Sequence, residues 1–292
     1  MNLLSTGNGT WAVALTGLTV LLLTSGCSSK GTDSKDIAPS ANEDVALSVA
    51  SSLADDNGGI ADQIKDLDAL TRSTGLNPIG KELRQLGWAA AAPIYDPQTG
   101  IWAWEFSHEF IGGNGKYHAL ISRSYQWKFM KSNGNPQIAY IVGSDTACSI
   151  ALTIVHGDGR HRTPHLSQTL TDLTGNFVAT GTNTTTVTVN GTCSRSAVDT
   201  VSTHNALRSL NHQTTLTLIN VQFQRAGAID PWESITGTIT GTFTADVSFT
   251  SGRAYGDRSI TREISVTLRQ GHAIISFDAK SFEADLLHGE LD

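Results

Sequence analysis

The chain has 292 residues, of which 39% are hydrophobic and 16% are charged, and its formal net charge at pH 7 is −7. A chain of this length and composition has enough apolar side chains to form a folded core. The acidic excess excludes the basic footprint of a nucleic-acid-binding protein, so we expect no nucleic acid among its partners. The excess lies at two places: residues 28–70 hold nine acidic and three basic side chains, and residues 283–292 hold four acidic and none basic.

The first 26 residues form a segment without any charged side chain. Residues 11–23 are a largely apolar run, which is too short for a transmembrane helix of about 20 residues. Such a run is typical of the central region of a secretory signal peptide. Ser25, Gly26 and Cys27 follow directly. We therefore expect residues 1–26 to be a signal peptide that is cleaved before Cys27.

The small residues before Cys27 resemble the lipobox of bacterial lipoproteins, in which that cysteine is acylated and becomes the mature N-terminus. The chain departs from the pattern at Thr24, where Leu is usual, and it has no Lys or Arg near Met1. The resemblance implies a lipoprotein of the bacterial cell envelope, held in the membrane by fatty acyl chains such as palmitate on Cys27. Ser28 after the cysteine is compatible with sorting to the outer membrane. The alternative is an ordinary cleaved signal with an unmodified Cys27.

Residues 27–43 have almost nothing to bury and predict a lipidated, flexible tether. Residues 44–292 then predict a single β-rich domain that begins with short helices over 44–87. Two apolar stripes at helical spacing support the first two helices, and a third is expected over 78–86. The stripes consist of Val45, Val49 and Leu53, and of Ile60, Ile64 and Leu67.

From about residue 89 onward apolar and polar residues alternate, which predicts antiparallel strands with one buried and one solvent-exposed face. The longest run is 235–250, which would span about 50 Å and must bend, with Gly237 and Gly241 as the bending points. The fold class is therefore mainly β, a long, curved antiparallel meander of ten to twelve strands preceded by the helices. The sequence leaves open whether the meander closes as a barrel, curls into a half-barrel over the helices, or folds into a sandwich.

Glycine-containing turns separate the alternating runs at 112–115, 133–135, 158–159 and 270–271. The apolar parity switches within 216–223, which predicts a β-bulge near Ile219. Cys148 and Cys193 both share the parity of buried neighbours. Because two cysteines remain after lipidation in an oxidising compartment, we expect a Cys148–Cys193 disulfide, the alternative being two separate buried thiols.

Large aromatic side chains share one face of two neighbouring strands: Trp102, Trp104, Phe106, Tyr125 and Trp127. They are interpreted as core packing or, alternatively, as the wall of a cavity that receives an apolar ligand. His156, His161 and His165 flank the expected turn at 158–159, which makes them candidate metal ligands. The alternative for them is a polar hairpin tip. Glu105 and Glu109 lie on the opposite face of their strand, where solvated carboxylates are the simpler interpretation.

No Gly-x-Ser-x-Gly, His-Glu-x-x-His or Cys-x-x-Cys motif is present, so we expect no cofactor and no assigned catalytic residue. The favoured function is a non-catalytic binding or structural domain of the envelope, with the membrane and an envelope protein as partners. The first alternative is a carrier of a lipid or other hydrophobic ligand. Helices before a curved meander on a lipid anchor look like the outer-membrane lipoprotein acceptors of the Lol system. An enzyme and a transmembrane barrel are the remaining alternatives.

Overall fold

The computed structural model describes residues 34–72, 89–90, 92–203, 206–225, 230–252 and 258–292. Two helices come first, α1 (Ser34–Leu53) and α2 (Ile60–Arg72). The long strands are β3 (Ile101–Gly112), β4 (Tyr117–Met130), β8 (Ser149–Arg162), β9 (Leu166–Thr180), β10 (Thr186–Thr203), β11 (Ala206–Gln224), β12 (Thr236–Gly252) and β13 (Arg258–Arg269). The shorter elements are β1 (Ala89–Ala90), β2 (Ile94–Asp96), a 3₁₀ turn (Gly113–Gly115), β5 (Pro136–Gln137), β6 (Ile141–Val142), β7 (Asp145–Thr146), α4 (Pro231–Ser234), β14 (His272–Phe277) and β15 (Lys280–Asp285).

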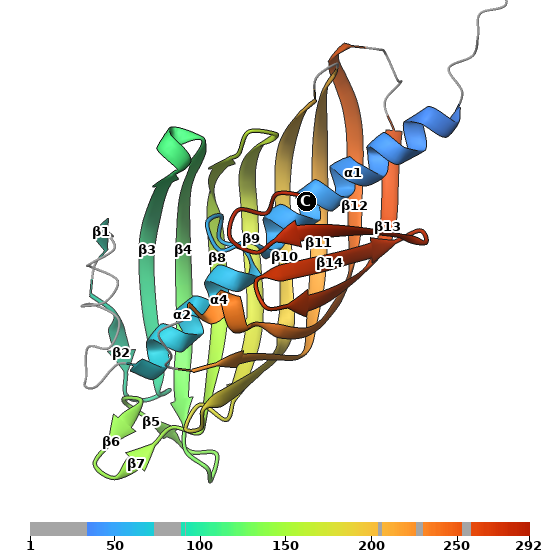
Figure 1. Ribbon diagram of the computed structural model, residues 1–292. Helices are drawn as coiled ribbons and strands as arrows, with labels where there is room; N and C mark the ends of the chain where they lie inside the picture. Colours follow the sequence, from blue (N-terminus) through green and yellow to red (C-terminus); the bar gives the residue numbers. More distant parts are fainter. Residues whose placement is uncertain (1–33, 73–88, 91, 204–205, 226–229, 253–257) are drawn as a thin grey trace, which may run out of the picture.

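The strands form one antiparallel sheet of 13 strands whose order follows the chain, as Figure 1 shows. Its path runs from β1 and β3 through β4, β8 and the strands that follow to β15, while β2 pairs with β3 and β5 with β4. Strands β6 and β7 form a separate pair. Among the described residues the first strands do not pair with the last, so the sheet is not a closed barrel. The expected long, curved antiparallel meander is confirmed.

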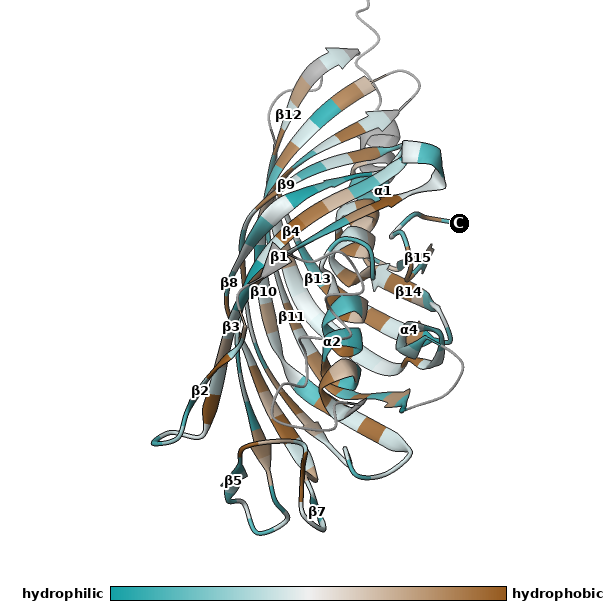
Figure 2. Ribbon diagram, turned by 90° about the vertical axis from the view of Figure 1, so that its left-hand side faces the viewer, coloured by the Kyte–Doolittle hydropathy of each residue, from teal (hydrophilic) through white to brown (hydrophobic). Residues whose placement is uncertain are grey.

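Alternation along each strand produces one buried and one exposed face, which Figure 2 shows as bands of opposite hydropathy. Strand β12 illustrates the pattern, because Ile239, Phe243, Ala245 and Val247 are buried and the Thr residues between them face outward. The strand has 17 residues, which corresponds to about 56 Å. Gly241 lies where a Cβ would come within 2.1 Å of the Thr215 carbonyl oxygen, so its lack of a side chain permits the close approach of β11.

The predicted β-bulge near Ile219 is confirmed. The register between β11 and β12 shifts between Ile219 and Gln222, and Asn220 has a φ of 51°. Ile219 is exposed whereas Val221 is buried, so the bulge changes which parity of the strand faces the core. The turns expected at 112–115 and 270–271 are also present, with Asn114 and Gln270 in the left-handed region.

Helices α1 and α2 lie on the concave side of the sheet, and the hairpin β14–β15 crosses over α1 (Figures 1 and 2). From Asp44 to Ala54 every residue of this segment is buried. A helix that is buried all round needs no amphipathic stripe, and α1 combines Val and Leu with Ala and Ser. The architecture is thus a half-barrel filled by its own helices. Among the described helices, none is long and apolar enough to cross a membrane.

Two expectations about the chain path are wrong. Helix α1 begins at Ser34, inside the segment 27–43 that composition predicted to be a flexible tether. The buried part of α1 supplies the nucleus, and each residue added to an existing helix gains a hydrogen bond. The third helix expected over 78–86 and the anchor Cys27 lie outside the described residues.

The second wrong expectation is the hairpin at Asp158–Gly159, because β8 runs straight through these residues. A Cβ at Gly159 would lie 2.3 Å from the Leu120 carbonyl oxygen of β4. The glycine therefore permits close packing of two strands and does not form a turn. A register shift after Ser124 in β4 leaves Val155 and His156 both exposed, which reverses the parity of the second half of β8.

Candidate functional site

A buried ionic cluster joins α2 to β4. Asp62 and Asp66 are one helical turn apart and so project from the same face of α2. Arg123 donates from Nη1 to Asp66 Oδ2 at 2.8 Å and from Nη2 to Asp62, and Tyr125 donates its hydroxyl to Asp66 at 2.7 Å. Burial raises the pKa of Asp66 to about 7, with the charge of Asp62 adding to it and Arg123 opposing it. This cluster holds the helix in place.

A comparable pair joins α1 to β11. Arg208 donates from Nη2 to Asp44 Oδ1 at 2.6 Å, and its Nε lies 2.5 Å from the other carboxylate oxygen. Both side chains are buried. Burial raises the pKa of Asp44 to about 6 although Arg208 opposes the shift. Each helix is therefore connected to a different strand by a buried ion contact.

A third polar cluster lies between β9, β10 and β11. His212 Nε2 lies 3.0 Å from Asp199 Oδ2, Thr214 Oγ1 lies 3.3 Å from His212 Nδ1, and Gln168 donates to Asp199 at 2.7 Å. Burial alone would raise the pKa of Asp199, but the contacts with His212 and Gln168 lower it below its ordinary value. A hydroxyl, an imidazole and a carboxylate in series are the groups of a nucleophilic relay. Thr214 is buried, however, and does not line any of the three clefts described below.

The five aromatic residues predicted to share one face are all buried in the core. Trp102 stacks on Trp127 at 5.9 Å between ring centroids, Trp104 stacks on Phe106 at 4.3 Å, and Phe106 meets Tyr125 edge to face at 5.1 Å. Two of them also contact the ionic cluster, because Arg123 lies over the rings of Phe106 and Tyr125 and the Tyr125 hydroxyl bonds to Asp66. The three clefts described below are lined by other residues. The use of the five aromatic side chains as a ligand wall stays a prediction. Their contacts are those of a packed core.

The three candidate metal-binding histidines do not lie together. His156 is exposed between Asp158 and Asp172, whereas His161 is buried on the opposite face with Nδ1 3.4 Å from the Asn57 amide nitrogen. Burial, helped by the charge of Arg195, lowers the pKa of His161 to about 3, so this imidazole is neutral. His165 lies in the connection from β8 to β9 and contacts Glu290 at 2.9 Å. Their expected convergence depended on the hairpin that does not form.

The predicted Cys148–Cys193 disulfide is wrong, since both cysteines are free. Cys193 pairs with Gly175, which in turn pairs with Ile154. Cys148 precedes Ile154 by six residues, which places the two thiols about 20 Å apart along the strands and two strands apart across them. A disulfide requires Cα atoms within about 7 Å. The shared alternation pattern predicted that both thiols lie on one side of the sheet. It did not predict where along their strands the two cysteines lie.

An open cleft of about 430 Å³ lies between α1, the end of β10 and the C-terminal segment. We call it the acidic cleft, because five of its lining residues are carboxylates. Leu47, Val201, Phe282 and Leu291 supply its apolar surface. The full lining is Glu43, Asp44, Leu47, His165, Val201, Ser202, Ser281, Phe282, Glu283, Glu290, Leu291 and Asp292. Only the local acidic composition of 283–292 pointed to this site in the sequence.

Two further clefts border strand ends and strand faces. One of about 560 Å³ shares His165 and Ser202 with the acidic cleft and also contains Lys116 and Arg162. Another of about 320 Å³ lies over β10 to β13 and is lined mainly by Ser, Thr, Asn and Gln with Asp246. The acidic cleft is distinguished from both by its combination of several carboxylates with an apolar surface.

The C-terminal segment that forms one wall of the acidic cleft is held against the helices. Leu286 and Leu287 accept backbone hydrogen bonds from Asp55 and Asp56 at 2.8 and 3.1 Å, and His288 contacts the Asp56 carboxylate. Gly289, with a φ of 72°, packs against the backbone of Ala50. These contacts fix the position of Glu290 and of the residues after it.

No family model matches the chain, and no significantly similar curated protein or solved structure was found.

Proposed function

We propose that the chain is a lipid-anchored protein of the bacterial cell envelope, in the outer membrane, and that its β domain is a non-catalytic binding module. The ligand site is the acidic cleft. The observation that carries this proposal is the grouping of Glu43, Asp44, Glu283, Glu290 and Asp292 around an apolar surface. Four of these carboxylates have a basic neighbour: Asp44 contacts Arg208, Glu290 contacts His165, and Glu283 and Asp292 lie 3.8 and 3.5 Å from His272.

The chemistry of this cleft fits a cationic side chain with apolar neighbours, such as a Lys- or Arg-containing segment of another envelope protein. Carboxylates attract the cation before contact, and the four apolar residues provide area that can be buried. The volume of about 430 Å³ is that of a small-ligand site and accommodates a few side chains, not a folded domain.

The peptide acetyl-Leu-Lys-Leu-amide tests the cleft by isothermal titration calorimetry at low salt. We expect saturable binding with a Kd of about 10–100 µM, which is reasonable for a ligand of this size. The same peptide with Glu in place of Lys should not bind. The double variant Glu43→Gln with Glu290→Gln should bind at least fivefold more weakly. Glu105→Gln removes one of the two exposed carboxylates of β3, outside the cleft, and is the control that should bind like the unmodified protein. Equal binding of the Lys and Glu peptides would exclude this site.

The anchor is tested separately. Intact mass of the mature protein should show diacylglycerol on Cys27, and Cys27→Ser should leave the membrane fraction. The start of α1 at Ser34 leaves only six residues between Cys27 and the helix, so a lipidated chain would hold the domain close to the bilayer surface. Recovery of the Cys27→Ser variant in the membrane fraction would contradict the anchor but not the cleft.

A hydrophobic-ligand carrier is the alternative that the half-barrel shape favours. In this structure α1, α2 and the aromatic side chains fill the concave side, so a lipid would have to displace the helices. A fluorescent fatty acid distinguishes the two functions. Saturable binding that quenches the emission of Trp102, Trp104 and Trp127 would support the carrier, and its absence would leave the binding module.

A further inference from the structure

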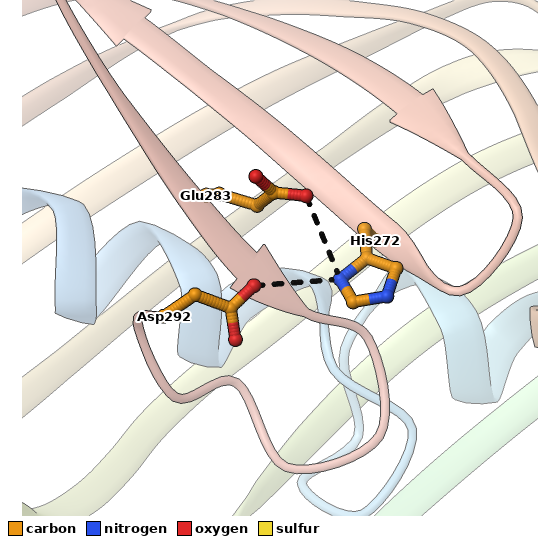
Figure 3. A group of neighbouring side chains, drawn as sticks. All are labelled: His272, Glu283 and Asp292. Atoms are coloured by element: carbon orange, nitrogen blue, oxygen red, sulfur yellow. Dashed lines mark ion pairs between the residues drawn. The ribbon is translucent and has the colours of Figure 1, made fainter.

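Figure 3 shows three side chains from separate segments that lie together: His272, Glu283 and Asp292. Glu283 and Asp292 also line the acidic cleft. His272 is the first residue of β14, Glu283 lies in β15 and Asp292 lies in the C-terminal segment. His272 Nδ1 is 3.5 Å from Asp292 Oδ2 and 3.8 Å from Glu283 Oε1. One ligand atom from each of the three side chains lies within 4.8 Å of the other two.

Backbone pairing determines this arrangement. In the ladder of β14 and β15, His272 pairs with Asp285, so Glu283 is its diagonal neighbour on the same face. The Asp292 backbone N–H donates to the Glu283 carbonyl oxygen at 3.0 Å, and Ala284 forms an isolated bridge with Leu291. The three side chains therefore start from backbone positions that the sheet already holds.

Both carboxylates approach the same ring nitrogen of His272, and this is the unusual feature. One N–H can be well aligned with only one acceptor, and neither distance is within the usual 2.7–3.2 Å of an N–H···O hydrogen bond. His156 provides the contrast, because Asp158 and Asp172 contact its two different nitrogens at 3.2 and 3.3 Å. Each of those contacts is an ordinary pair, and the two carboxylates cannot converge with the ring on one ion.

We propose that His272, Glu283 and Asp292 bind a divalent transition-metal cation of the Zn²⁺ type. One imidazole nitrogen and two carboxylate oxygens are donors that such an ion accepts. A tetrahedral ion with bonds of about 2.1 Å has ligand atoms about 3.4 Å apart, close to the separations of 3.5 and 3.8 Å. The three side chains are 50–57% exposed, so the remaining coordination positions face solvent.

The ion would neutralise part of the acidic cleft, since Glu283 and Asp292 line it. Metal and a cationic peptide should therefore weaken each other's binding by the same factor. The metal site rests on the triad alone and does not require that the cleft binds a peptide. It would also join the C-terminal segment to the hairpin β14–β15.

Titration of tag-free protein with ZnCl₂ by calorimetry, without peptide, tests the proposal. We expect one site with a Kd of about 1–50 µM, because three solvent-exposed ligands hold the ion less tightly than a closed structural site. His272→Ala should weaken binding at least tenfold. His156→Ala removes the matched histidine with two carboxylate neighbours and should leave the affinity unchanged.

Two results would overturn the metal site: absence of saturable Zn²⁺ binding, or the same affinity in His272→Ala as in the unmodified protein. Circular dichroism of His272→Ala should be unchanged, since the side chain is exposed. His272→Ala should still bind acetyl-Leu-Lys-Leu-amide, so failure of the metal site is distinguishable from failure of the cleft. Binding of Zn²⁺ that His156→Ala abolishes would assign the ion to the other histidine and would also overturn the proposal.

Discussion

Replacement of Arg123 by Met should strongly destabilise the protein at pH 8. The Met side chain approximates the aliphatic part of Arg123 but leaves Asp62 and Asp66 without their cation. The Arg123 side chain is 1% exposed and the two carboxylates are 4% and 8% exposed, so water cannot replace the lost charge. Removal of one partner from a buried ion pair typically costs about 3–5 kcal/mol, and we expect a loss of that size in the free energy of unfolding.

The loss should be smaller at pH 5, and the sign follows from the raised pKa of Asp66. A carboxyl group whose pKa is raised in the folded state contributes stability below its ordinary pKa of 3.8, and this contribution is lost as pH rises through about 7. At pH 5, below a pKa of about 7, Asp66 is mostly protonated even with Arg123 present, so removal of Arg123 leaves no isolated charge on Asp66 there. The remaining loss is that of the hydrogen bonds and of the contact with Asp62, so it should be smaller than the loss at pH 8.

Urea unfolding monitored by tryptophan fluorescence measures this effect, because Trp104 and Trp127 are buried in the same core. Lys131→Met is the control: its pair with Asp145 is exposed, and the change should stay within about 0.5 kcal/mol. Adding Asp62→Leu and Asp66→Leu to Arg123→Met should recover most of the stability. A loss below about 1 kcal/mol at pH 8, or an equal loss at both pH values, would refute the assignment of Arg123 as the counter-ion of both carboxylates.

Three further predictions follow from local geometry. Gly289→Ala should lower the free energy of unfolding in urea by at least about 1 kcal/mol more than Gly143→Ala does. Both glycines have a positive φ, but only a Cβ at Gly289 would meet the Ala50 backbone, at 2.9 Å. Equal losses would contradict that contact. Iodoacetamide without reductant should alkylate Cys148 before Cys193, because burial raises the pKa of the Cys193 thiol to about 11. A Cys148–Cys193 disulfide-linked peptide found by peptide mapping would contradict this prediction. Burial raises the pKa of Asp56 from its ordinary 3.8 to about 7, against the opposing contact with His288, so stability should fall as pH rises from about 4 to about 7. Asp56→Asn should reduce that slope, and an unchanged slope would exclude Asp56 as its source.

Local patterns predicted those parts of the fold that are themselves local. The alternation over 235–250 identified β12, and the parity switch identified the bulge at Ile219. Gly159 misled the same reasoning, because a glycine that admits a neighbouring backbone has the same sequence signature as one that turns the chain. Only the position of Leu120 in β4 distinguishes the two cases, and that position depends on strand register.

The candidate sites depend on pairings between distant parts of the chain, which one sequence does not reveal. Asp44 and Arg208 are 164 positions apart, and His165 and Glu290 are 125 apart. The sequence did contain one usable signal, since Arg123 has the inward parity of Ile121 and Tyr125. A charged residue at a buried position requires a partner, and the acidic pair on α2 is spaced to supply it. That reasoning would have placed α2 against the inner face of the sheet.

The buried ion contacts also account for how the helices are oriented inside the half-barrel. From Asp44 to Ala54 the chain is buried on every side, so rotating α1 about its axis exchanges one set of small or apolar buried side chains (Val, Leu, Ala and Ser) for another. The hydrophobic effect is non-directional and discriminates weakly between such rotations. A rotation that moves Asp44 away from Arg208, or Asp62 and Asp66 away from Arg123, would leave buried charges unpaired, which is strongly unfavourable. We therefore infer that apolar burial holds the helices within the sheet and that the ion contacts select one orientation. On this reasoning the triple variant at Arg123, Asp62 and Asp66 should recover stability, but its α2 should adopt more than one orientation against the sheet.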